Sequence, residues 1–166
     1  MQAQTGFGGG CHWCTEAVFQ GIRGVTLVKQ GWIASRPPDD IFSEAVIVHY
    51  APKVIPLDIL IEIHLLTHAS QQNHSMRRKY RSAIYARNAS QLVLAKQRLE
   101  VVAKGFDKPV VTRVLPLAVF KPSDEAYQNY YRTDPMRPFC RTHIEPKLQK
   151  IRTEYTNYAA TAPRKP

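Results

Sequence analysis

The chain contains few cysteines and few acidic residues for its length. Of its 166 residues 3 are cysteine, and 13 Asp and Glu stand against 23 Lys and Arg. So few cysteines exclude the disulfide framework of a small secreted domain. No apolar run is long enough to span a bilayer, and the first six residues have neither the basic stretch nor the hydrophobic core of a secretory signal. We therefore expect a cytoplasmic protein with no membrane partner.

The shortage of acidic residues leaves a formal net charge of +10. Such a charge would attract nucleic acid, anionic surfaces or acidic partner proteins. Basic residues gather at 77–81 and at 141–152, but neither cluster belongs to a recognisable nucleic-acid motif. We interpret them as a solvated basic surface, expect no nucleic-acid partner, and keep docking of an acidic redox partner as an alternative.

A hydrophobic content of 44% is sufficient for one domain of ordinary size. We expect this domain to span residues 1–152. After Thr153 the chain is rich in Thr, Asn, Ala, Pro and Lys, which predicts a disordered tail over 153–166.

Hydrophobic periodicity and turn residues predict an alternation of helices and strands that is not strict. This order indicates an α+β two-layer sandwich, with a mixed or antiparallel sheet, packed helices and a ferredoxin-like core. The expected helices are Trp13–Ile22, Pro56–Leu66, Gln91–Ala103 capped by Ser90, one or two turns in 123–131, and 142–152. The expected strands are Val25–Ile33, Ala45–Tyr50, Tyr80–Tyr85 and Val110–Phe120.

The densest chemistry lies in the run Gly8-Gly9-Gly10-Cys11-His12-Trp13-Cys14, where three glycines precede two thiols in the first turn of a predicted helix. The unpaired N–H groups and partial positive charge of a helix start favour the thiolate, which is the nucleophilic form of cysteine. The run therefore predicts a reactive cysteine. A structural turn followed by small buried cysteines is the alternative.

Four segments recur in this order in one family: the Gly-Cys-x-Trp opening, Glu44–Tyr50, Lys79–Tyr85 and Ala126–Tyr131. On these motifs the chain resembles peptide methionine sulfoxide reductase of type A from about residue 7 to residue 150. The resemblance implies thiol-dependent reduction of methionine S-sulfoxide, peptide-bound or free, to methionine in the repair of oxidative damage.

The resemblance also implies roles for individual residues. Cys11 matches the thiolate that attacks the sulfoxide sulfur, and Glu44 matches the acid that protonates the oxygen. Apolar neighbours would raise the pKa of Glu44 and allow it to donate at neutral pH. Tyr80 matches a tyrosine that binds the oxygen, and Trp13 matches the wall against which the substrate methyl packs. By composition alone, Glu44 would be an edge-strand surface carboxylate and Tyr80 a packed strand residue.

Attack by Cys11 leaves a sulfenic acid, which a second thiol converts to a disulfide. Cys140 resembles the late resolving cysteine of many relatives, and we place it slightly ahead of Cys14. Cys14 is either a first resolver or a modulator of the Cys11 pKa, and a relay through all three thiols is a further alternative. The reductant is then an external dithiol such as thioredoxin, with no bound cofactor or metal, and we expect a monomer.

The chain departs from the family pattern around the substrate. The Phe that follows the nucleophile is His12 here, which makes one wall of the methyl pocket polar. Trp32 is either a compensating pocket wall or a core residue. Ser75 replaces an aspartate, and no tyrosine lies in the shortened loop 34–41. The candidate substitutes for the lost oxygen donors are His12, His74 and Tyr127.

Three other functions stay open. Cys11, Cys14, His64 and His68 could form a zinc site, although their spacing does not resemble that of a zinc finger. An inactive or altered homologue could act as a binding module or a thiol-disulfide redox sensor. A general thiol oxidoreductase would use the C-x-x-C motif without Glu44 or Tyr80.

Overall fold

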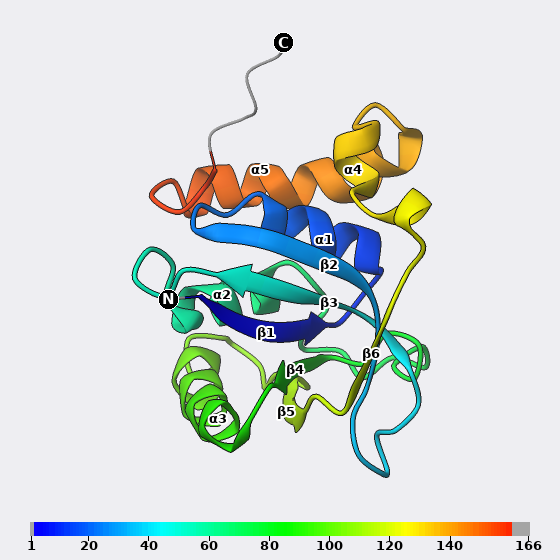
Figure 1. Ribbon diagram of the computed structural model, residues 1–166. Coiled ribbons are helices and arrows are strands. Elements are labelled where there is room, and N and C mark those ends of the chain that lie inside the picture. Colours follow the sequence, from blue (N-terminus) through cyan, green and yellow to red (C-terminus); the bar gives the residue numbers. More distant parts are fainter. Residues whose placement is uncertain (1, 161–166) are drawn as a thin grey trace.

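A twisted six-stranded sheet with helices on one face forms the frame of the protein in a computed structural model that describes residues 2–160 (Figure 1). The strands are β1 (Ala3–Gly8), β2 (Val25–Ala34), β3 (Ser43–Tyr50), β4 (Ala83–Ala86), β5 (Arg113–Pro116) and β6 (Val119–Pro122). The helices are α1 (His12–Gln20), α2 (Leu57–Leu66), α3 (Ala89–Ala103), α4 (Tyr130–Thr133) and α5 (Glu145–Glu154), with a 3₁₀ turn η1 (Glu125–Tyr127) and a π-helical turn η2 (Cys140–Ile144).

The strand order is β5-β4-β1-β3-β2-β6, in which β4 and β5 are parallel and the other neighbours antiparallel. The first six elements follow the connectivity βαββαβ, with the order β4-β1-β3-β2 of a ferredoxin-like unit. The α+β class with a mixed sheet is therefore confirmed. Sequence analysis named no strand before the glycine run, whereas β1 lies at the centre of the sheet between β3 and β4.

Each face of the sheet contributes to a separate hydrophobic core, because successive side chains of a strand point to opposite faces. On β3, Val46 and Val48 belong to the larger core beneath the helices. Ala45 and Ile47 face the other way and join a smaller core. Since Glu44 is also an even-numbered residue of β3, the strand places its side chain on the helix face.

The predicted strand Val110–Phe120 is two strands on opposite edges of the sheet, which corrects the sequence interpretation. Between β5 and β6, the N–H of Leu117 donates to Ala86 O at 2.8 Å and that of Ala118 donates to Ala34 O at 3.1 Å. Two consecutive residues thus join the ends of β4 and β2, which are not neighbours in the sheet. The sheet curls so that this segment covers the smaller core.

Two smaller expectations are also wrong. Helix α3 is capped by Asn88, whose side chain accepts the N–H of Gln91 at 2.9 Å, and not by Ser90, which lies within the helix. The strand expected over Tyr80–Tyr85 begins only at Ala83, so Tyr80 lies in the preceding turn.

The segment after Thr153 is ordered as far as Ala160, where disorder was expected. Helix α5 ends at Glu154, and the following turn returns to α1, with Ala160 N donating to Gly21 O at 2.8 Å. The hydroxyl of Tyr155 donates to Glu62 of α2 at 2.6 Å. Two tyrosines that pack on the larger core outweigh the polar composition of the segment. The rest of the predicted tail, 161–166, lies outside the described residues.

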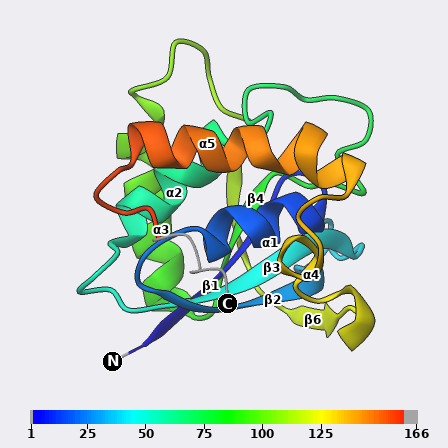
Figure 2. The same ribbon diagram turned by 90° about the horizontal axis from the view of Figure 1, so that it is seen from above.

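Helix α5 lies across the helix layer, as the view from above shows (Figure 2). Leu148 and Ile151 place its buried side on the same core as α1 and α2. Cys140 begins the turn η2, which leads directly into α5, so the packing of α5 fixes this late cysteine in the same core as Cys14 of α1. Within residues 2–160, no helix is long and apolar enough to cross a membrane.

The close pairing of β2 with the edge strand β6 can be tested at Gly31. A Cβ at this position would collide with the carbonyl oxygen of Lys121 and lie 2.9 Å from the Cα of Pro122. We expect Gly31→Ala to lower the free energy of unfolding by about 1–3 kcal/mol, because backbone atoms must move. Urea unfolding measures this. Gly10→Ala is the control, since a Cβ there meets nothing within 4 Å; equal stability loss in both variants would contradict the prediction.

Candidate active site

The glycine run lets the chain pass closely between the sheet and α2 before α1 begins. A Cβ on Gly8 would lie 2.9 Å from the carbonyl oxygen of Glu44, and one on Gly9 would lie 2.5 Å from the ring of His68. Around Gly10 there is open space. The absence of side chains thus delivers Cys11 to the helix start and leaves room for a ligand beside it.

Cys11 is the N-cap residue of α1, and its carbonyl oxygen accepts the N–H groups of Cys14 and Thr15 at 3.1 and 3.2 Å. It is partly exposed, as a thiol that attacks an external ligand must be. The Cys14 thiol, hydrogen-bonded to the Cys11 sulfur, lowers the pKa of Cys11, and the N–H groups of Trp13 and Cys14 act in the same direction. Burial and the charge of Glu44 act against this shift.

Cys14 and Cys140 are buried together in the larger core, and all three cysteines are free thiols. The hydrogen bond to Cys11 and burial raise the pKa of Cys14, while the ammonium of Lys147 on α5 lowers it. Burial also raises the pKa of Cys140, which is 0% exposed. The charges of Cys11 and Cys140 also act to raise the pKa of Cys14.

Glu44 lies at the start of β3 beside the first turn of α1, and 7% of its surface is exposed. Its Oε1 accepts the backbone N–H of His12 at 3.3 Å. Its Oε2 lies 3.7 Å from Nζ of Lys79. The structure thus places the predicted acid next to the predicted nucleophile, rather than on an exposed edge.

Tyr80 lies in the turn before β4, and the neighbouring Lys79 connects it to Glu44. The ammonium of Lys79 lies 5.1 Å from the centre of the Tyr80 ring and also interacts with Glu44. Tyr80 and Glu44 raise the pKa of Lys79, and Cys11 contributes in the same direction. Lys79 therefore connects the three residues predicted to act on the sulfoxide. Sequence analysis did not identify it, because nothing in its neighbourhood along the chain reveals a carboxylate 35 residues away.

Trp13 stacks on Tyr130 of α4, with ring centres 4.1 Å apart and planes 5° apart. Phe139 meets the indole edge-on at 5.7 Å, and the Arg137 guanidinium lies 4.2 Å from the centre of the Tyr130 ring. In the described part of the chain, Nε1 of Trp13 is buried with no hydrogen-bond partner. The aromatic wall predicted from Trp13 is thus a cluster that also includes Tyr130 and Phe139, for which no role was predicted from the sequence.

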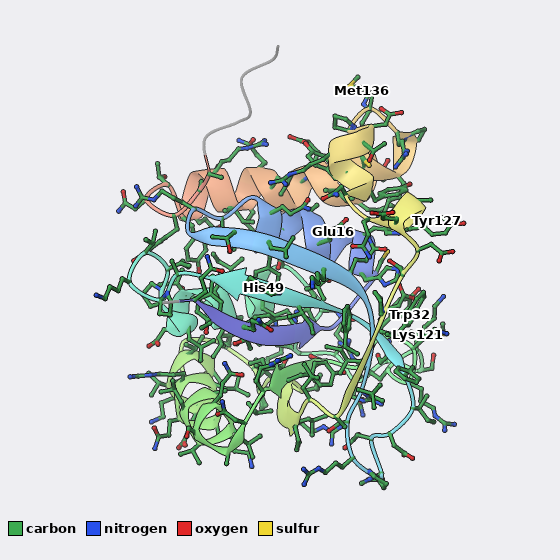
Figure 3. All side chains as sticks on the ribbon, in the orientation of Figure 1. Glu16, Trp32, His49, Lys121, Tyr127 and Met136 are labelled. Carbon is green, nitrogen blue, oxygen red and sulfur yellow. The ribbon has the colours of Figure 1, made fainter. Side chains whose placement is uncertain are left out.

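His12 and Trp32 meet on the helix face of the sheet. Trp32 is the cross-strand partner of Glu44, and its ring lies edge-on to His12 at 5.2 Å. Nζ of Lys121 lies 5.9 Å from the centre of the Trp32 ring (Figure 3). Nδ1 of His12 is 2.8 Å from Gly31 O, and Nε2 is 3.4 Å from Oε1 of Glu44. Both ring nitrogens therefore face protein groups.

Glu16, a fully buried carboxylate on α1, anchors the segment that carries Tyr130 (Figure 3). It accepts the N–H groups of Asn129 and Tyr130 at 2.9 and 3.1 Å, and the side-chain amide of Gln30 at 3.1 Å. Asn129 adopts a left-handed conformation with φ 58°. The helical spacing of Glu16 from His12 was visible in the sequence, but its partners more than 100 residues away were not.

The other candidate oxygen donors, His74 and Tyr127, are more exposed than His12, and so is Ser75, which replaces the aspartate of the family. Ser75 is exposed, and Nδ1 of the partly exposed His74 accepts the N–H of Met76 at 3.2 Å. Tyr127 is 53% exposed at the molecular surface (Figure 3). In the shortened loop 34–41, Asp39 binds Arg113 at 2.7 Å and thus serves to fix the loop.

The two histidines of the alternative zinc site, His64 and His68, form hydrogen bonds with other groups of the protein. Nε2 of His64 is 2.9 Å from Gly8 O, and Nε2 of His68 is 2.8 Å from the Ser82 hydroxyl. Burial lowers the pKa of His68 to about 4 and lowers that of His64 as well, so both rings are neutral at pH 7. Among residues 2–160, no group of three or more His, Cys, Asp and Glu side chains is arranged to hold a metal ion.

Comparisons with known proteins agree on one family. The family model described as peptide methionine sulfoxide reductase matches residues 3–159. The chain is 32% identical to peptide methionine sulfoxide reductase MsrA of Deinococcus radiodurans, over 93% of this chain and 82% of the relative. It is 34% identical to MsrA of Ralstonia nicotianae, over 90% of this chain and 89% of the relative.

Solved structures show the same fold at lower identity. Mxr1 from Saccharomyces cerevisiae in reduced form matches with a TM-score of 0.74 at 22% identity, over 86% of this chain and 91% of that one. Methionine sulfoxide reductase A of Corynebacterium diphtheriae matches with a TM-score of 0.69 at 23% identity, over 81% and 76%. Mxr1 in complex with Trx2 matches with a TM-score of 0.60 at 21% identity, over 78% and 84%.

The hydrogen bond between the two thiols of the C-x-x-C motif can be tested by alkylation. We expect Cys14→Ala to raise the pKa of Cys11, because its largest lowering influence is removed. At a fixed pH below the pKa, the thiolate fraction and the rate of Cys11 alkylation by iodoacetamide then fall by up to about tenfold for each unit of increase. Peptide mass spectrometry follows the reaction at Cys11. Cys14→Ser, which keeps a hydroxyl donor, should retain most of the rate; equal rates for Cys14→Ala and the parent would contradict the prediction.

Proposed function

The chain belongs to the peptide methionine sulfoxide reductase family, whose reaction is the reduction of methionine sulfoxide, and we propose that Cys11 is the thiol that attacks the substrate sulfur. The observation that carries this assignment is the position of Cys11 at the start of α1, with its pKa lowered and a buried carboxylate beside the next residue. A helix start favours the thiolate, and a neighbouring proton donor assists attack on the sulfur of a sulfoxide.

The reaction consumes one thiolate and one proton. The Cys11 thiolate attacks the sulfur of the sulfoxide, the oxygen moves to the cysteine sulfur, and a proton neutralises the charge that develops on it. The products are methionine and Cys11 sulfenic acid. We assign the proton transfer to Glu44, because its carboxyl group is buried beside the helix start and its Oε2 lies 3.7 Å from the ammonium of the exposed Lys79 side chain.

We assign binding of the sulfoxide oxygen to Tyr80, with the Lys79 ammonium as a second source of positive potential. Both lie on the side of Glu44 away from the His12 ring. A cation at this place stabilises negative charge on the oxygen during the attack, which offsets the loss of the donor that the shortened loop does not carry. We assign the substrate methyl to Trp13, with Trp32 as the opposite aromatic wall and His12 between them.

For the next step we propose that Cys14 attacks the sulfenic acid first. The Cys14 thiol and the Cys11 sulfenic acid form a disulfide and release water. Cys14 is hydrogen-bonded to Cys11, whereas Cys140 is buried behind it in the core. This order differs from the slight preference for Cys140 from sequence. It leaves Cys140 to take over the disulfide by exchange with Cys14, which completes a relay.

We propose that a thioredoxin-like dithiol then reduces the enzyme, without a bound cofactor or metal. The solved complex of yeast Mxr1 with Trx2 supports this choice of partner. Three free thiols suit a reducing compartment such as the cytoplasm. We further propose a monomer in which residues 1–152 supply the catalytic groups, since every assigned residue lies within them.

The assignment of Cys11 and Glu44 is tested by turnover of a peptide that contains methionine sulfoxide. With dithiothreitol as reductant, we expect the S epimer to be reduced and the R epimer to remain, and Cys11→Ser to have no activity. Glu44→Gln should lose roughly 100-fold or more in kcat/KM, because a positioned proton donor contributes about that factor.

The same assay separates the proposed reductase from its alternative. No reduction of either epimer by the intact protein would contradict the reductase assignment and favour an altered homologue with a thiol-disulfide sensing role. Disulfide reductase activity that survives Glu44→Gln would instead favour a general thiol oxidoreductase.

The order of the thiols is tested by trapping the sulfenic acid after one equivalent of substrate. We expect Cys14→Ser to accumulate a dimedone adduct on Cys11, and Cys140→Ser to form the disulfide between Cys11 and Cys14 at nearly the parent rate. Quenched-flow sampling and peptide mass spectrometry measure both species. Accumulation of the adduct in Cys140→Ser alone would show that Cys140 resolves the sulfenic acid directly.

A further inference from the structure

The His12 ring is held by two acceptors of different kinds. Nδ1 lies 2.8 Å from the carbonyl oxygen of Gly31, and Nε2 lies 3.4 Å from Oε1 of Glu44. The second distance is within the range of an ion pair and a few tenths of an ångström longer than an ideal hydrogen bond. His12 and Glu44 are 6% and 7% exposed, so water has little access to either group.

This geometry fixes where the protons of the pair lie. A carbonyl oxygen only accepts, so Nδ1 carries hydrogen in both charge states of the ring. When the pair holds one exchangeable proton, either Nε2 carries it and faces an ionised Glu44, or Oε1 carries it and faces a neutral ring. In both of these arrangements the two side chains together are electrically neutral.

We propose that His12 is a positioning residue that stores the proton which Glu44 passes to the sulfoxide oxygen. The inference rests on the proposed function of Glu44 and adds a residue to it. In the stored state the proton is on Nε2 or on Oε1. As negative charge develops on the sulfoxide oxygen, the proton moves fully to the carboxyl group, and rotation of that group about its Cγ–Cδ bond presents the protonated oxygen to the substrate. His12 itself does not contact the substrate oxygen, because both of its nitrogens are engaged.

The step balances without another reactant. Cys11 thiolate, the sulfoxide and the shared proton give Cys11 sulfenic acid and methionine, and the pair is left as neutral His12 and ionised Glu44. Lys79 at 3.7 Å and the N–H of His12 at 3.3 Å stabilise that carboxylate. One proton from solvent then restores the pair before the next turnover.

The surroundings supply other charges that a pH study must consider. On α1, burial raises the pKa of Glu16, and a charge on the nearby His12 ring acts against this shift. Strand β2 presents the Gly31 carbonyl and the uncharged Trp32 ring, with Lys121 of β6 beyond that ring. The titratable and charged groups around the pair are Cys11, Glu16, Lys79, Tyr80 and Lys121.

The first test is the pH dependence of kcat/KM for the S epimer with dithiothreitol. His12→Asn keeps an amide donor for Gly31 but cannot share a proton with Glu44, and His12→Phe removes both functions. A carboxyl group without an imidazole partner gives up its proton at lower pH, since the ordinary values of the two groups differ by about two units. We therefore expect activity of both variants to decline at a pH lower by about one unit or more than in the parent.

His49→Asn is the matched control, because His49 lies at the far end of β3 from Glu44 (Figure 3). Its profile should coincide with that of the parent. A parent-like profile in His12→Asn, or a loss by the same factor at every pH, would overturn the proposal, since each is what a purely structural role predicts.

A second measurement does not depend on activity. In reduced protein labelled with ¹⁵N-histidine, we expect the His12 ring to keep hydrogen on Nδ1 at every pH, and Nε2 to lose its hydrogen at a lower pH in Glu44→Gln than in the parent. Identical Nε2 titration in both proteins would overturn the shared proton. Absence of turnover in the parent contradicts the proposed function, whereas normal turnover with an unaltered pH profile in His12→Asn contradicts the role of His12 alone.

Discussion

The hydrogen bond from the His12 N–H to Glu44 joins the sheet to the start of α1, and the active site depends on it. A helix start has unpaired N–H groups, and a buried carboxylate needs donors. Each feature satisfies the other, so the proposed nucleophile at the N-cap and the proposed acid on β3 are held together. The glycines before Cys11 make this approach possible, because a side chain on Gly8 would strike the carbonyl of Glu44 itself.

A second buried carboxylate, Glu16 on α1, organises the proposed substrate wall. Glu16 accepts N–H groups at the start of α4 and fixes Tyr130 against Trp13. The start of α1 thus carries both thiols of the motif and, one turn further on, the anchor of the segment that stacks Tyr130 on Trp13. Because η2 and α5 follow from that segment and pack on the same core, Cys140 lies near Cys14 for a structural reason.

The family and the α+β class were predictable because short motifs occur in order along the chain. The same motifs identify Cys11, Trp13, Glu44 and Tyr80 as candidate site residues, and their roles stay a prediction. Strand β1 was not predicted, since its glycines and polar residues do not resemble a strand and its central position comes from pairing with β3 and β4. The division of 110–120 between two edges depends on how the sheet curls, which periodicity does not encode. Lys79, Tyr130 and Gln30 were missed because their partners are distant in sequence and only the fold brings them together.

In the structure, the departures from the family pattern gather around the carboxylate of Glu44. An aromatic ring that contributes only apolar surface is replaced by His12, whose Nε2 faces the acid, while Lys79 approaches the other carboxylate oxygen. Two groups that can carry positive charge therefore flank Glu44 at a site that lacks an aspartate and a tyrosine of the family. Neither group lies on a strand, since His12 begins α1 and Lys79 lies in the turn before β4. The reaction at such a site requires enough positive charge and available protons around the reacting oxygen, and it depends less on which residue supplies each of them.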